Sequence, residues 1–249
     1  MKAIIGNCGH GGSVCVWIDL SATGKPIALC KSSSRDGVQD LRREMQGMDW
    51  YLARGGGPLK YRVMNERPEY FAFATDYIEG RQYSPRDGLM NNAEPVFALV
   101  KHYAEIWDAP DKEGKGALHG DLALGNAIFV NGKPTLVDWE HFREDGAPLG
   151  FDALYLIYTC LWFETWGKKP RKDSLQLIGK IIAYLIIKSR ISPEVAISPL
   201  ANIRRIIVEN KDWWRGQIGK LPPLLYSNAI VESTDAVIDA MTGLRENIK

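Results

Sequence analysis

The spacing of apolar residues predicts strands at the start of the chain. Apolar runs at residues 2–5, 14–20 and 26–31 are separated by a glycine cluster and by a turn of Ser, Ala, Thr, Gly and Lys. Short apolar runs bounded by turn residues are typical of strands. Another run at 70–78 is broken by a Glu-Gly pair at 79–80, which indicates a further strand.

Helical spacing follows and dominates the second half of the chain. In residues 36–54 apolar side chains recur at steps of three and four, which predicts one buried face: Val38, Leu41, Met45, Met48 and Leu52. Further helices are expected at 94–107, 151–166, 173–190, 196–219 and 224–245. A strand-rich start and a helical remainder predict an α+β protein of two lobes. The expected division is an N-terminal lobe of residues 1–79 and a C-terminal lobe of residues 80–249.

Composition excludes several classes of protein. Apolar residues make up 45% of the chain and charged residues 24%, the balance of a folded globular protein. The four cysteines form no C-x-x-C pair and no zinc-like cluster with histidine, so they are interpreted as reduced thiols. The start of the chain lacks the apolar core of a signal peptide, and the longest uncharged apolar run, 153–163, is too short to cross a bilayer. We therefore expect a cytoplasmic protein.

The charge is distributed unevenly, although the net charge is only +1 and gives no indication of a nucleic-acid partner. Residues 160–220 carry 12 Lys and Arg against 5 Asp and Glu, clustered at 168–172, 188–190 and 204–205. Such clusters indicate an anion-binding surface or ordinary solvated helix faces, and the sequence leaves both open. It also leaves open a peripheral membrane contact through this basic part, as well as the oligomeric state.

A hairpin in the middle of the chain brings polar side chains together. The Asn-Gly pair at 131–132 lies between two apolar runs, which is a strong signal for a two-residue hairpin turn. With that turn, Asn126 lies opposite Val137, and Asn126 and Asp138 are neighbours, roughly 5–8 Å apart, at the open end. Asp121 lies on the loop that enters the same end.

Three oxygen-bearing side chains at one place suit metal-assisted chemistry. Magnesium takes hard oxygen ligands and keeps several waters, so Asn126 and Asp138 are candidate metal ligands. A further carboxylate beside the metal, Asp121, suits a base that orients an attacking hydroxyl. The alternative is that Asp121 and Asn126 merely cap a turn.

Two motifs in this segment resemble those of the aminoglycoside phosphotransferase and choline kinase family. His-Gly-Asp at 119–121 with Asn126 five residues on is similar to H-G-D-x-x-x-x-N, and Val-Asp-Trp-Glu at 137–140 is similar to I-D-[FW]-E. The resemblance implies a two-lobed protein-kinase-like fold and transfer of phosphate from ATP with Mg²⁺. It assigns the catalytic base to Asp121 and the metal to Asn126 and Asp138. His119 would brace the loop, and the role of Glu140 stays open.

The resemblance extends to the N-terminal lobe. Residues 7–14 fit G-x-G-x-x-G-x-V with Asn7 in place of the first glycine, so Asn7, Gly9 and Gly12 are candidate phosphate-loop residues. Lys31 ends a strand and matches the V-A-I-K lysine, which neutralises phosphates. Glu44 lies on the apolar stripe of the 36–54 helix, where a carboxylate is costly unless paired. The resemblance implies that Lys31 is the ion-pair partner of Glu44.

Two further positions follow from the resemblance. The hinge at 75–80 would bind adenine through the Asp76 carbonyl and the Ile78 amide. Asp152 either anchors the catalytic loop, as in the family, or caps the helix that begins beside it.

The acceptor is expected to be small, because only thirteen residues separate Asp138 from Asp152 and no long peptide-docking segment fits between them. The basic clusters favour an anionic sugar, such as a sugar of a surface glycan or of a lipopolysaccharide core. A cationic acceptor, such as an aminoglycoside antibiotic, choline or ethanolamine, is the alternative, and a nucleotide-binding pseudokinase scaffold is another. Trp162, Trp166, Trp213 and Trp214 could stack on an acceptor or pack in the core.

Overall fold

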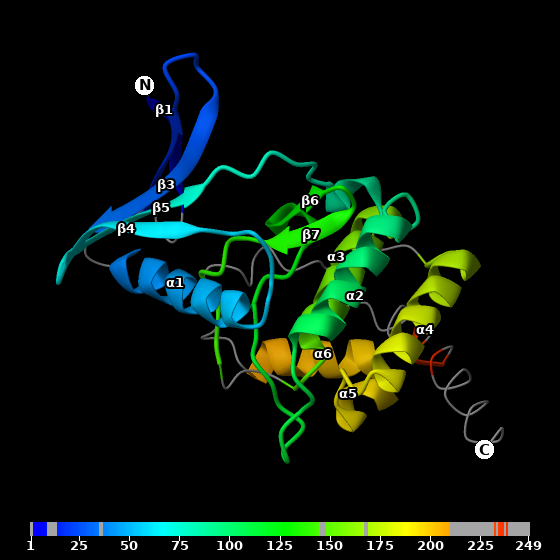
Figure 1. Cartoon of the computed structure of the whole chain (residues 1–249). Helices are drawn as coiled ribbons and strands as arrows, with labels where there is room; N and C mark the ends of the chain where they lie inside the picture. Colours follow the sequence, from blue (N-terminus) through cyan, green and yellow to red (C-terminus); the bar gives the residue numbers. More distant parts are fainter. Residues whose placement is uncertain are drawn as a thin grey trace.

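A computed structural model describes most of the chain. The described residues are 2–8, 14–34, 37–144, 148–166, 169–209, 232, 234–236 and 238. They form the predicted α+β arrangement, with strands gathered at the N-terminal end and helices beyond the hinge (Figure 1). Gly9 and Gly12, Lys168, Trp213 and Trp214 lie outside the described residues.

The N-terminal part is a five-stranded antiparallel sheet in the order β1-β2-β3-β5-β4. Its strands are β1 (Lys2–Cys8), β2 (Val14–Leu20), β3 (Pro26–Ser34), β4 (Tyr61–Arg67) and β5 (Tyr70–Asp76). Helix α1 (Val38–Ala53) packs on β3 and β5. It buries the predicted stripe, with Val38, Leu41 and Met48 at most 2% exposed.

Two features of this sheet differ from the sequence prediction. Strand β1 extends to Cys8, so Asn7 is paired with Cys15 in the sheet and does not begin a loop. Strand β4 was not predicted, because its residues are mostly polar or exposed and show no apolar run. It is an edge strand that pairs with β5 alone in this sheet.

The C-terminal part combines one small hairpin with helices. Strands β6 (Ala127–Val130) and β7 (Lys133–Leu136) form the hairpin, and short 3-10 turns lie at η3 (Pro85–Asp87) and η4 (Leu124–Asn126). The helices are α2 (Ala93–Ile106), α3 (Phe151–Thr165), α4 (Lys172–Ile187), α5 (Pro193–Ile197) and α6 (Pro199–Glu209). The helix predicted from residue 196 is therefore divided in its described part, because Ser198 leaves the helical conformation before Pro199. No described helix is long and apolar enough to cross a membrane.

The hinge segment is attached to the hairpin as well as to the sheet. The Arg81 amide donates a hydrogen bond to the Phe129 carbonyl at 2.9 Å, and the Phe129 amide donates one to the Arg81 carbonyl at 2.8 Å. Gly80 lies so close to the hairpin that a β-carbon there would be 2.6 Å from Ile128 Cγ2 and 2.8 Å from the Phe129 carbonyl oxygen. The segment that leaves the sheet is therefore in direct contact with β6.

Candidate active site

The hairpin turn forms as the sequence predicts. Asn131 and Gly132 both have positive φ, 51° and 78°, as a tight two-residue turn requires. Ala127 pairs with Leu136, and the Val137 amide donates to the Asn126 carbonyl at 3.0 Å. Asn126 thus lies opposite Val137, which places Asp138 at the same open end.

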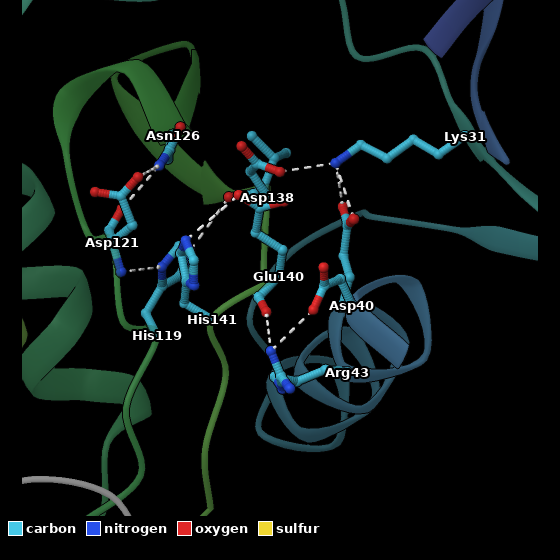
Figure 2. Close-up of polar contacts among 11 residues, drawn as sticks. Lys31, Asp40, Arg43, His119, Asp121, Asn126, Asp138, Glu140 and His141 are labelled. Atoms are coloured by element: carbon cyan, nitrogen blue, oxygen red, sulfur yellow. Dashed lines mark hydrogen bonds and ion pairs between the residues drawn. The ribbon is translucent and has the colours of Figure 1, made fainter. Parts of the chain in front are cut away.

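Asn126 holds Asp121 with its amide nitrogen. The Nδ2 group donates to the Asp121 main-chain oxygen at 2.8 Å and to its Oδ2 at 3.1 Å (Figure 2). Among the described residues the Asn126 Oδ1 atom has no partner, so it is free to bind a cation. Burial raises the pKa of Asp121, and the nearby His141 opposes that shift.

The loop that carries Asp121 is anchored by α3. Asp152 accepts hydrogen bonds from the His119 amide at 2.7 Å and from the Gly120 amide at 3.1 Å. The residue that caps α3 is Gly150, so of the two roles considered for Asp152 the structure shows the anchor. Burial raises the pKa of Asp152 to about 7, although both amide bonds oppose the shift.

His119 braces the same loop from inside. Burial lowers the pKa of its ring to about 4, so the ring is neutral near pH 7. With the proton assigned to Nε2, this nitrogen donates to the Val137 carbonyl at 3.2 Å, and Nδ1 accepts from the Asp121 amide at 3.4 Å. The ring packs on Trp139 at a centroid distance of 4.4 Å. A buried neutral ring of this kind positions backbone and transfers no proton.

Lys31 connects the two lobes. Its Nζ atom lies 2.7 and 2.8 Å from the two Glu44 oxygens, which is the predicted ion pair, and 2.7 Å from Asp138 Oδ1 (Figure 2). Burial alone would lower the pKa of Lys31, but the two carboxylates raise it well above its usual range. The ammonium holds the pKa of Asp138 below its usual range against the effect of burial. For Glu44 burial is the larger effect and raises the pKa to about 7.

Asp138 has an unusual backbone conformation. Its φ of 66° lies in the left-handed region, which most residues with a β-carbon adopt only at a cost and which Asp and Asn adopt more readily. Such conformations are found at functional sites, where the surrounding structure holds them. Here the conformation brings the carboxylate of Asp138 to Lys31.

A cleft of about 500 Å³ runs between the sheet and the hairpin. Apolar side chains from the sheet and the hairpin line it: Val14, Val16, Leu29, Phe73 and Ile128. Lys31, Glu44, Asn126 and Asp138 lie on its wall, and so do the hinge residues 76–78. Among the described residues the Ile78 amide has no hydrogen-bond partner, so the cleft presents a free donor at its hinge edge.

The segment after Asp138 is connected to α1. Arg43 Nη1 donates to the Glu140 carbonyl at 3.1 Å and pairs with Asp40 at 3.3 Å (Figure 2). His141 Nε2 lies 3.4 Å from Glu140 Oε1, and hydrogen bonding to that carboxylate raises the pKa of His141 despite burial. Glu140, whose role the sequence left open, is thus held through its carbonyl by Arg43 and lies beside His141 through its carboxylate.

Comparison with known proteins gives matches among solved structures alone. No protein-family model and no curated protein matches the sequence. The chain is similar to the ADP-bound aminoglycoside phosphotransferase APH(2'')-Ib, at 13% identity and a TM-score of 0.49, over 93% of this chain and 94% of that one. It is also similar to APH(2'')-IIa in a ternary complex with streptomycin and ATP, at 10% identity and a TM-score of 0.43, over 75% and 84% of the two chains.

Some of the basic residues in the C-terminal part are occupied by internal contacts. Arg190 donates to the carbonyls of Ala104 and Lys188, at 3.0 and 3.1 Å, and Arg171 pairs with Glu164 at 3.3 Å. Arg205 is exposed on α6 and donates to Asn202 Oδ1 at 3.3 Å. Fewer basic side chains are therefore available for an acceptor than the sequence count suggests.

The aromatic residues considered for the acceptor also differ in exposure. Trp166 is 66% exposed at the end of α3, whereas Trp162 is partly buried against the core. Trp166 also contacts the rings of Trp162 and Phe163, at centroid distances of 6.3 and 5.6 Å, so its exposed part is what could meet an acceptor.

One neighbour of Asp121 was not predicted. Tyr155 on α3 lies near enough to Asp121 that, after burial, the negative charge of this carboxylate raises the pKa of the Tyr155 phenol. The signal in the sequence was its place three residues after Asp152, on the same side of the helix.

Proposed function

We propose that this chain is an ATP-dependent kinase that moves the γ-phosphate to a hydroxyl of a small molecule or glycan. The observation that supports this most is the position of Lys31. Its ammonium lies 2.7 Å from both Glu44 and Asp138 on the wall of the cleft, opposite the Asp121–Asn126 pair. A cation and two candidate metal ligands line this cleft, and the candidate base Asp121 is hydrogen-bonded to one of those ligands, Asn126. These are the groups that phosphoryl transfer uses.

Each part of the cleft has a role in this proposal. The apolar walls would enclose adenine, with the Ile78 amide and the Asp76 carbonyl as its hydrogen-bond partners. Lys31, oriented by Glu44, would neutralise the phosphates. Gly9 and Gly12 are proposed for the phosphate loop from the sequence alone, with Asn7 in the strand that precedes them.

The donor atoms suit magnesium. Asn126 presents a free amide oxygen, and Asp138 a carboxylate whose side chain is 40% exposed. Two protein ligands would leave positions for the waters and phosphate oxygens that Mg²⁺ prefers. When bound, the ion would neutralise charge on the transferred phosphate.

Asp121 would orient the acceptor hydroxyl. Its carboxylate is held by Asn126 and its loop by Asp152, so its position is fixed before the acceptor arrives. Its raised pKa also brings it nearer to the range in which a carboxylate accepts a proton efficiently.

For the acceptor we propose an anionic sugar. The support is the excess of basic residues after residue 160, which includes Arg204 and Arg205 on α6. A cationic aminoglycoside or choline would be repelled by such a surface and would favour an acidic or aromatic pocket.

The test is a paired measurement of binding and turnover. ATP with Mg²⁺ should raise the melting temperature by mass action, and ADP release should then be screened with phosphorylated or acidic sugars, choline and aminoglycosides. No thermal shift at millimolar nucleotide would overturn the kinase proposal. Efficient turnover of a cationic acceptor would overturn the anionic acceptor alone, and nucleotide binding without turnover of any acceptor would favour the pseudokinase scaffold.

A further inference from the structure

Helix α1 contacts the chain on both sides of Asp138. Before it, the Leu136 amide donates to the Tyr51 hydroxyl oxygen at 3.1 Å. After it, Arg43 Nη1 donates to the Glu140 carbonyl at 3.1 Å (Figure 2). One helix therefore holds the backbone before and after the candidate metal ligand.

The hairpin itself provides no acceptor for the Leu136 amide. Along an antiparallel strand, hydrogen-bonded and non-hydrogen-bonded positions alternate. The Val137 amide donates to the Asn126 carbonyl at 3.0 Å, so the Leu136 amide points to the other side, toward α1. Leu136 is buried, and a buried amide without an acceptor is costly. The Tyr51 hydroxyl therefore supplies the acceptor that the hairpin lacks.

The Tyr51 hydroxyl has a second partner on α2. His102 Nε2 lies 2.6 Å from the phenol oxygen. Because this oxygen accepts from the Leu136 amide, its own proton is donated to His102, with the imidazole proton assigned to Nδ1. Burial lowers the pKa of His102, so the ring is neutral near pH 7 and able to accept. The hydroxyl is thus fixed by one donor and one acceptor from separate elements.

The Tyr51 ring is held as closely as its hydroxyl. It is fully buried, packs on Trp139 at a centroid distance of 5.1 Å and meets the His102 ring edge-on at 5.7 Å. The ring also lies so close to Gly56 that no β-carbon fits there. Trp139 Nε1 in turn donates to the Leu136 carbonyl at 3.4 Å. Both backbone groups of Leu136 are therefore bonded to side chains that pack on each other.

We propose that Tyr51 is a positioning residue for the candidate metal ligand Asp138, and that His102 acts with it. Tyr51 fixes the Leu136 backbone, and only Val137 separates that residue from Asp138, whose left-handed backbone must be held by its surroundings. Removing a group that orients a metal ligand typically lowers metal affinity by roughly 10–100-fold. The metal itself rests on the proposed kinase function, whereas the contact of Tyr51 with Leu136 can be tested without it.

The perturbation is Tyr51→Phe, which keeps the ring and removes the hydroxyl. The matched control is Tyr103→Phe on α2. The Tyr103 hydroxyl also accepts from a buried amide, that of Gly150 at 3.0 Å, but this amide precedes α3 and does not belong to the segment of Asp138. Both variants should lose similar stability, because each leaves one buried amide without its acceptor.

The first measurement is calorimetric binding of ATP, with Mg²⁺ and with EDTA. Mg²⁺ should tighten ATP binding by the wild type, and Tyr51→Phe should lose roughly tenfold of this gain while its affinity in EDTA is unchanged. Tyr103→Phe should keep the whole gain. His102→Gln, which retains an acceptor, should keep more of it than His102→Leu, which has none. A full gain in Tyr51→Phe would overturn the proposal.

A double-mutant cycle tests whether Tyr51 acts through Asp138. In the Asp138→Asn background, Tyr51→Phe should have almost no further effect on the affinity for ATP with Mg²⁺. Losses that multiply in full across the two sites would overturn the positioning role and leave the kinase proposal intact. Absence of nucleotide binding by the wild type would instead overturn the kinase proposal, and with it the metal that Tyr51 is proposed to serve.

Hydrogen exchange of the Leu136 amide needs no nucleotide. In chains with isotope-labelled leucine, this amide should exchange about tenfold faster in Tyr51→Phe than in Tyr103→Phe, because only the first variant removes its acceptor. Equal exchange rates in the two variants would overturn the contact itself.

Discussion

Gly120 offers a direct test of how closely the loop that carries Asp121 packs on its neighbours. It has φ of 89°, in the left-handed region that favours glycine. A β-carbon at this position would lie 2.5 Å from both the β-carbon and the carbonyl oxygen of His141. Gly120→Ala therefore introduces a strained backbone and a clash with main-chain atoms that cannot rotate away.

The magnitude follows from these two effects. A left-handed conformation costs a residue with a β-carbon about 1–2 kcal/mol. Overpacking at a buried contact costs about 1–3 kcal/mol more. The free energy of unfolding should therefore fall by about 2–5 kcal/mol, a large part of the stability of an ordinary domain. Turnover should fall as well, because the residue next to the clash is Asp121.

Gly125, on the same loop, provides the matched control. A β-carbon there would meet no atom within 4 Å, and its φ is not positive. Gly125→Ala should leave stability unchanged or raise it by up to about 1 kcal/mol, because alanine restricts the unfolded chain. Both variants can be compared by urea unfolding followed by tryptophan fluorescence, since Trp139 is fully buried beside His119. Equal stabilities of Gly120→Ala and Gly125→Ala would refute the close packing of the loop on His141.

Other predictions concern chemistry and pH. Asp121→Asn should keep nucleotide affinity within a few-fold and lower turnover by roughly 10²–10⁴-fold, as measured by ADP release; turnover at the wild-type level would remove Asp121 from its role. Asp138→Asn should weaken binding of ATP with Mg²⁺ in a titration, because it removes a charge from the metal site; unchanged affinity would count against that site. Glu in place of Arg204 and Arg205 should raise the acceptor KM at unchanged ATP affinity, and an unchanged KM would contradict the anionic acceptor. Burial raises the pKa of Asp152 to about 7, so the folded chain holds a proton that the unfolded chain releases near pH 4. The contribution of this proton to stability is present below about pH 4 and is lost as pH rises through about 7. The melting temperature of Asp152→Asn should therefore depend less on pH across this range than that of the wild type.

The hairpin and the helix stripe were predictable because their signals are local. The Asn-Gly turn fixes the register of β6 and β7, and register alone places Asn126 beside the strand that precedes Asp138. Glu44 was recognised by its position on an apolar face, where a carboxylate requires a partner. Both predictions depend only on residues that lie close together in the sequence.

Contacts between distant segments were not predictable in this way. The sequence left Asp152 between two roles, because a helix cap and a loop anchor use the same residue type at the same position. Strand β4 is polar and lies at the sheet edge, so no periodicity indicates it. The proximity of Tyr155 to Asp121 depends on how α3 packs against the loop, which a single sequence does not specify.

The left-handed backbone at Asp138 has a consequence for how this position can vary. With φ at 66°, side chains other than those of Gly, Asn and Asp incur a conformational cost before any chemistry is considered. Asn and Gly are therefore the substitutions that remove the charge of Asp138 at the least conformational cost. A descendant of this chain that lost activity by drift should reach one of these two residues at position 138 first, while a β-branched residue there would signal a rebuilt loop.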